Sequence, residues 1–122
     1  MNDSISMTED QPISEFDDGV QADMTPLVSD FSFDDLPETL RSIVASIGWT
    51  EPTPVQSAAI PTLMTGRDLI VQAKTGSGKT AAYLLPMIQT VAPGNEWSQA
   101  LVLVPTRELA RQVYEVLMQL IE

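Results

Sequence analysis

The residues best suited to chemistry in this sequence form one continuous run, Ala73-Lys74-Thr75-Gly76-Ser77-Gly78-Lys79-Thr80. Gly76 and Gly78 free the backbone to turn its N–H groups toward one point, so that a phosphate can be wrapped without side chains in the way. Lys79 is predicted to reach the β- and γ-phosphates, and the Thr80 hydroxyl to hold Mg²⁺. Ala73 departs from the usual pattern, which has glycine there. The run therefore predicts a nucleotide-phosphate site.

Two residue types are absent from the sequence, and their absence limits the kinds of catalytic and metal sites that it can form. The sequence contains no Cys and no His. This excludes disulfides, thiolate or imidazole metal sites, and Cys or His acting as nucleophile or base. The formal net charge is -11, but residues 1–40 hold 11 acidic and no basic residues, whereas residues 41–122 hold 6 of each. The negative charge therefore does not argue against nucleic-acid binding by the second segment.

The acidic N-terminal segment, residues 1–30, has no helical or strand periodicity among its few apolar residues. We predict a disordered arm, because too little apolar surface is available to offset the entropy of ordering. Two interpretations stay open: a solvated arm that confers solubility, and a tail that docks a protein partner or competes with a polyanion. No stretch has the character of a secretory signal or a membrane span, which predicts a cytoplasmic protein without membrane contact.

Two helices are predicted before the phosphate loop. Pro37 is predicted at the first position of a helix, since apolar residues from Leu36 to Ile47 recur at helical spacing, and Gly48 is expected just past the end of this helix. Thr53 is predicted as the N-cap of a second helix with Pro54 in its first turn. Pro61 is expected to interrupt that helix or to start a further turn, and Gly66 to close the segment.

Strands and helices are predicted to alternate from the phosphate loop onward. The apolar runs Leu69–Val71 and Leu101–Val104 predict buried strands, and helices are expected over Lys79–Thr90, with a kink at Pro86, and over Thr106–Glu122. This order is typical of an α/β fold with a parallel sheet. The last helix is expected to turn its apolar residues inward: Leu109, Val113, Val116, Leu117 and Leu120.

Three separated segments together resemble one family, the DEAD-box ATP-dependent RNA helicases. The run Ala73–Thr80 resembles its motif I, which also tolerates Ala in the first position. Gly48-Trp49-Thr50-Glu51-Pro52-Thr53-Pro54-Val55-Gln56 resembles its Q motif, and Pro105-Thr106-Arg107-Glu108-Leu109-Ala110 is similar to its motif Ia. The resemblance extends from about Phe31 to the end of the chain. It implies an incomplete first RecA-like domain over residues 31–122, with ATP, Mg²⁺ and RNA as ligands and Lys79 and Thr80 as catalytic residues.

The resemblance also implies roles outside the phosphate loop. The Gln56 amide has a donor and an acceptor in one plane and would pair with the N6 and N7 edge of adenine. Phe33 would stack on the base, with Phe31 as second choice. Pro105, Thr106 and Arg107 lie where a helix begins, which suits sequence-independent contacts with RNA phosphates. Arg111 and Glu115 are interpreted as ordinary surface charges.

An acidic pair following an apolar strand, which would hold Mg²⁺ and orient the attacking water, is missing from the sequence. We therefore expect the N-terminal part of a helicase, inactive in hydrolysis and poorly folded by itself. Two alternatives stay open: a catalytically inactive fragment that binds nucleotide or partners, and a DNA-directed translocase, which the motif Ia resemblance disfavours.

Overall fold

The computed structural model describes residues 30–122 of the chain. The predictions of a disordered, partner-docking arm concern residues 1–30 and so lie almost wholly outside the described residues. The elements follow the order η1 (Phe33–Asp35), α1 (Glu38–Ser46), α2 (Pro54–Met64), α3 (Lys79–Thr90) and α4 (Arg107–Ile121). No helix in this part of the chain is long and apolar enough to span a membrane.

The helix starts follow the capping residues of the sequence. Thr53 caps α2, and its hydroxyl accepts a hydrogen bond from the Gln56 N–H. Thr106 caps α4 in the same way through the Leu109 N–H. Pro37 lies at the N-cap of α1, one position before its predicted place in the first turn. All four predicted helices are therefore present, with boundaries shifted by about one turn or less.

Two prolines lie inside helices. The predicted interruption at Pro61 does not occur, since α2 continues to Met64. Tertiary packing outweighs the lost hydrogen bond there, because the residue before it, Ile60, is fully buried and α2 packs closely on α3. Pro86 likewise lies within α3 and is itself buried.

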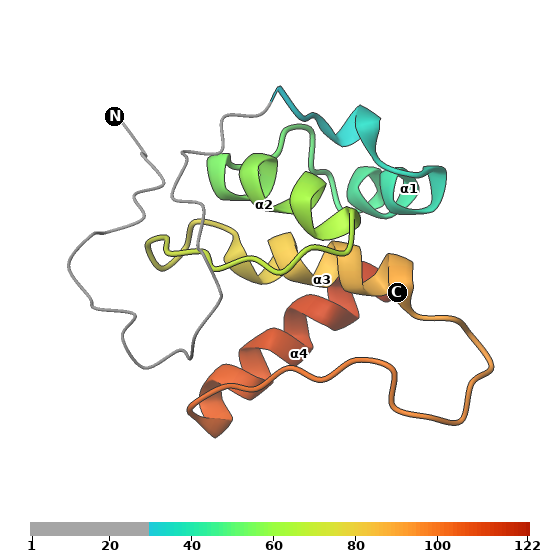
Figure 1. Cartoon of the computed structure of the whole chain (residues 1–122), viewed down its shortest axis with the longest axis vertical. Helices are drawn as coiled ribbons and strands as arrows, with labels where there is room; N and C mark the ends of the chain where they lie inside the picture. Colours follow the sequence, from blue (N-terminus) through green and yellow to red (C-terminus); the bar gives the residue numbers. More distant parts are fainter. Residues whose placement is uncertain (1–29) are drawn as a thin grey trace.

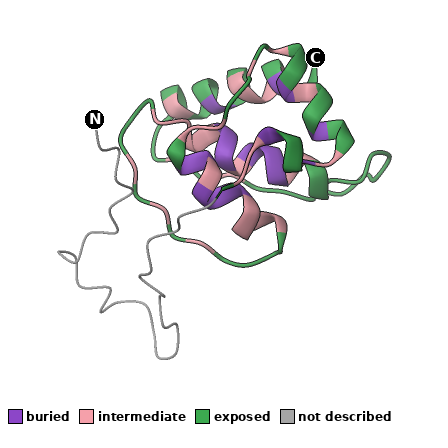
Figure 2. Ribbon diagram, turned by 90° about the horizontal axis from the view of Figure 1, so that it is seen from above, coloured by how far each residue is buried: buried purple, intermediate pink, exposed green. Residues whose placement is uncertain are grey.

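The core lies on the inner faces of the helices. Figure 1 shows α2 on one side of α3 and α4 on the other, and both pack against α3. Figure 2 shows that buried residues concentrate where the helices face one another. The buried core residues are Phe33, Leu36, Leu40, Val44, Ile60, Leu84, Leu85, Val113 and Leu120.

The predicted parallel sheet is not confirmed, because residues 30–122 contain no strand. Both apolar runs nevertheless alternate as strands do. Ile70 is 60% exposed between half-buried Leu69 and Val71. Leu101 and Leu103 are 82% and 84% exposed and alternate with half-buried Val102 and Val104. A strand is defined by its ladder of hydrogen bonds to a neighbour, and the described residues form no such ladder around these runs.

Candidate functional site

The phosphate loop turns sharply into the first turn of α3. The Ser77 N–H donates to the Lys74 carbonyl at 3.2 Å, which closes the turn. Gly76 and Gly78 have φ values of +80° and +90°. Gly78 is the N-cap of α3, and no side chain caps this helix. The positive end of the α3 dipole therefore lies at the loop without a side-chain oxygen to compensate it.

Gly78 also allows a close approach between the loop and α2. A Cβ atom at this position would lie 2.6 Å from Gln56 Nε2 and 3.0 Å from Thr53 Oγ1. A side chain at this position would require the Gln56 and Thr53 side chains to shift. Glycine is therefore favoured for two reasons, its left-handed backbone and the space that Gln56 and Thr53 occupy.

Gln56 joins the first turn of α2 to the phosphate loop. Its side chain Oε1 accepts from the Thr53 N–H at 3.0 Å, while its Nε2 donates to the Gly78 carbonyl at 3.3 Å. The residue is only 4% exposed. The sequence predicted Gln56 as an adenine reader but missed this reciprocal capping with Thr53. The Thr-x-x-Gln spacing was the available signal, since it matches a capping box.

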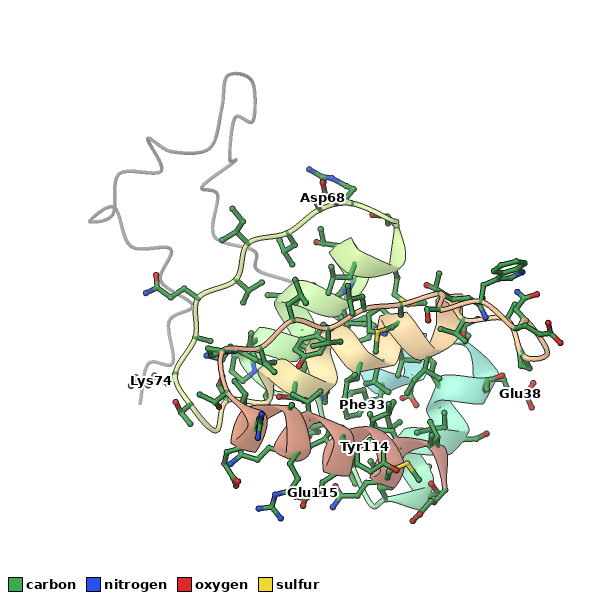
Figure 3. All side chains as sticks on the ribbon, turned by 90° about the horizontal axis from the view of Figure 1, so that it is seen from below. Phe33, Glu38, Asp68, Lys74, Tyr114 and Glu115 are labelled. Atoms are coloured by element: carbon green, nitrogen blue, oxygen red, sulfur yellow. The ribbon has the colours of Figure 1, made fainter. Side chains whose placement is uncertain are left out.

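Lys79 points back across its own loop. Its ammonium group donates to the Ala73 carbonyl, and the side chain is half-buried. Thr80 follows it in the first turn of α3 and is also half-buried. Lys74, by contrast, is exposed and projects outward from the loop (Figure 3). Lys79 thus folds back over the loop, whereas Lys74 extends into solvent.

An open groove of about 1160 Å³ runs along the phosphate loop. It brings together residues of all three predicted motifs, from segments far apart in the sequence. Its remaining walls are largely apolar and include Val71 and Val104, from the two runs predicted as strands. The predicted site residues that line it are Gln56, Thr75, Gly76, Gly78, Lys79, Thr80 and Pro105.

Phe33 lies away from the groove. It is 5% exposed, belongs to the core, and stacks on Trp49 with ring centroids 6.4 Å apart. Phe31, the second choice for adenine stacking, is half-buried, and its carbonyl accepts from the Ser57 hydroxyl at 3.5 Å. Ser57 directly follows Gln56 in α2. The backbone of Phe31 therefore lies close to the predicted adenine reader, but neither phenylalanine lines the groove, and Phe31 also packs against the core.

The second predicted phosphate contact lies at the start of α4. Thr106 and Arg107 are both exposed, and the Thr106 hydroxyl accepts from the Leu109 N–H at 3.1 Å. Arg107 forms no ion pair with any residue in the range 30–122. The start of α4 therefore presents a cation and a capped helix end to solvent.

The charges further along α4 are exposed, as the sequence predicted, and they form ion pairs. Arg111 donates to Glu108 at 2.9 Å and lies 3.2 Å from Glu115, which Figure 3 shows on the outer side of the helix. The hydrogen bond to Glu108, and then the charge of Glu115, raise the pKa of Arg111. Among residues 30–122, no cluster of three or more acidic side chains could hold a metal ion.

The model of the DEAD/DEAH box helicase family matches residues 53–122. An ATP-dependent rRNA helicase, RRP3 of Lodderomyces elongisporus, is 50% identical over 91 residues, which are 74% of this chain and 18% of that protein. ATP-dependent RNA helicase dbp9 of Neosartorya fischeri is 47% identical over 97 residues, covering 75% of this chain and 16% of the relative.

Solved structures give the same result. A DEAD box protein from Methanococcus jannaschii matches 76% of this chain and 26% of its own, with a TM-score of 0.69 and 36% identity. The RNA helicase Prp28 from Chaetomium thermophilum, bound to ADP, matches 83% of this chain and 26% of its own, with a TM-score of 0.68 and 39% identity. The chain thus spans less than a fifth of the two curated relatives and about a quarter of these two structures.

Proposed function

The chain belongs to the DEAD/DEAH box helicase family, and on that premise we propose that residues 31–122 supply the adenine- and phosphate-binding part of an ATP-dependent RNA helicase. The observation that carries the proposal is the hydrogen bond from Gln56 Nε2 to the Gly78 carbonyl. It joins a side chain able to pair with adenine directly to the loop able to wrap phosphate. The solved relative from Chaetomium thermophilum is bound to ADP, which supports a nucleotide as the ligand.

The loop residues divide the work on the phosphates. The backbone N–H groups at the start of α3 would wrap the phosphates, and Lys79 would leave the Ala73 carbonyl to bind them. The Thr80 hydroxyl fits Mg²⁺ because a neutral oxygen in the first turn after the loop suits a hard cation shared with phosphate. When bound, Mg²⁺ neutralises charge that develops on the transferred phosphoryl group.

The adenine end of the groove uses α2. Gln56 would exchange its present partners, the Thr53 N–H and the Gly78 carbonyl, for the donor and acceptor of the base. Base stacking is assigned to Phe31, because its backbone is bonded to the helix turn that carries Gln56 and the ring of Phe33 is buried. The apolar walls of the groove suit a purine ring.

RNA is proposed to contact the start of α4. Pro105 lines the groove and Arg107 is exposed without an ion pair among the described residues. Contacts from a helix start and an arginine go to phosphate oxygens, so binding would be independent of RNA sequence and weakened by salt. We also propose Leu69–Val71 and Leu101–Val104 as strands of a parallel sheet, which their alternating burial supports.

The proposal is tested by measuring ADP and GDP binding to the chain by titration calorimetry with Mg²⁺ present. The wild type is expected to prefer ADP by about 5- to 150-fold, the discrimination of one bidentate base contact. Gln56→Ala is expected to remove the preference for ADP over GDP. Lys79→Ala is expected to weaken the binding of both nucleotides by about tenfold or more.

Thr53→Ala is the matched control. It breaks the same capping box as Gln56→Ala but leaves the amide in place. This variant is expected to lose some stability and to keep the preference for ADP. Equal affinity of the wild type for ADP and GDP would overturn the assignment of Gln56 as the adenine reader.

A further inference from the structure

The chain enters the described fold beside the groove. The Phe31 carbonyl accepts a hydrogen bond from the Ser57 hydroxyl at 3.5 Å. Ser57 directly follows Gln56, which lines the groove. Residues 1–29 are therefore tethered next to the helix turn that forms one wall of the groove.

Charge differs sharply between the two sides of this junction. Residues 1–29 contain 7 acidic and no basic residues. Lys79 lines the groove, and Lys74 and Arg107 are exposed, each within two residues of a lining residue. Neither Lys74 nor Arg107 forms an ion pair among the described residues, and Glu51 is the one acidic residue that the groove lining includes. An acidic segment tethered at this place is therefore attracted to cations at the rim of the groove.

The same segment carries an apolar group that fits the groove. Phe16 is the only aromatic residue before Asp30, and it lies between Glu15 and Asp17. The walls of the groove are largely apolar and suit such a ring. The 14 residues from Phe16 to Ser29 extend to about 46 Å at most, more than twice the length of α3, which is about 18 Å. The length of the segment therefore allows Phe16 to reach the groove.

We propose that residues 1–29 fold back over the groove of the same chain, with Phe16 against its apolar wall and the neighbouring acidic side chains facing Lys74 and Arg107. The occupant is a segment of this chain because tethering gives it an effective concentration of about 1 mM or more, which a separate acidic protein lacks. The docked segment competes with RNA for Arg107. This competition rests on the proposed function, whereas the docking itself does not.

The docking is tested by fluorescence in the full chain, which contains no Cys and two Trp. Trp49 lines the groove, whereas Trp97 lies outside its lining and is 81% exposed. A nitroxide attached to Ser14→Cys quenches a tryptophan only at short range. The label is expected to quench Trp49, measured in a Trp97→Phe background. It should leave Trp97 nearly unchanged in a Trp49→Phe background, which keeps a ring to stack on Phe33.

Phe16→Ala is the decisive variant, because it removes the aromatic ring and no charge. It is expected to restore most of the Trp49 emission, and added salt should do the same in the wild type by screening the acidic side chains. Equal quenching of Trp49 with and without Phe16, or quenching of Trp97 as strong as that of Trp49, would overturn the proposal. Quenching that increases with protein concentration would also overturn it, since the segment would then dock on a second copy.

The consequence for RNA is measured by the anisotropy of a labelled single-stranded oligoribonucleotide. The unlabelled Phe16→Ala chain is expected to bind it about fivefold or more tightly than the wild type at low salt, a usual size for coupling between two ligands. Equal affinities would reject competition with RNA. If the oligoribonucleotide binds neither chain, the proposed RNA contact is rejected, and the quenching, measured without RNA, still decides whether residues 1–29 dock.

Discussion

The sequence predicted that the starts of α3 and α4 both bind phosphate, but the two helices differ in their N-caps and first turns. At α4, Thr106 caps the helix and Glu108 places a negative charge in the first turn. At α3, the cap is a glycine with no side chain, the first turn contains no acidic residue, and it begins with Lys79. The dipole of α4 is thus partly compensated within the helix, whereas that of α3 is not.

The difference indicates two kinds of anion contact. An uncompensated helix start next to a lysine is poised for a ligand that is enclosed and held tightly. A capped and exposed start with one free-standing arginine suits a surface contact that positions a backbone. We therefore expect substitutions at the start of α3 to lower the stability of the fold more than substitutions in α4.

Gly78→Ala is expected to have the largest effect. Both this variant and the matched control Gly76→Ala place a Cβ at positive φ, which costs about 1–2 kcal/mol. Nothing lies within 4 Å of a Cβ at Gly76, but at Gly78 it would meet Gln56. Gly78→Ala should therefore lose about 1–3 kcal/mol more unfolding free energy in urea titrations. Equal losses of unfolding free energy for the two variants would show that the close contact between Gly78 and α2 does not restrict the residue at this position.

Thr106→Ala is expected to have a smaller effect. Loss of the cap on α4 should lower the unfolding free energy by about 1 kcal/mol, because the Leu109 N–H loses its acceptor. Thr106→Ser retains the cap and should behave as the wild type in the same urea titration. A loss as large as that of Gly78→Ala would contradict the ranking of the two helix starts.

Arg111→Gln is expected to have the smallest effect. Its ion pairs with Glu108 and Glu115 are exposed, and such pairs add little to stability. The melting temperature should stay within experimental error of the wild type at physiological salt. A clear drop would show that charge pairing, rather than the Thr106 cap, holds the first turns of α4.

Helix positions could be predicted because their signals are local. Thr53 and Thr106 mark the starts of α2 and α4, and Gly48 and Gly66 follow the ends of α1 and α2 at positive φ. The path of α2 through Pro61 could not be predicted, since it depends on tertiary packing with α3. Propensity is a weak guide wherever burial decides the outcome.

The candidate site was predictable to the level of motifs, and less so for individual contacts. The sequence placed Gln56 and Lys79 at one nucleotide, and the structure brings both to one groove. The sequence named Phe33 for adenine stacking, with Phe31 as second choice, but spacing alone does not reveal that Phe33 is buried.

The run Leu101–Val104 has a consequence for handling the protein. Leu101 and Leu103 face solvent almost fully, and no charged residue lies between Trp97 and Thr106. Uncharged β-branched and leucine-rich segments with open backbone groups are templates for pairing between molecules. The colloidal behaviour of this chain should therefore be governed by these few residues. A single Leu101→Lys substitution, at a position outside the helices and outside the lining of the groove, should raise the concentration at which the chain begins to self-associate.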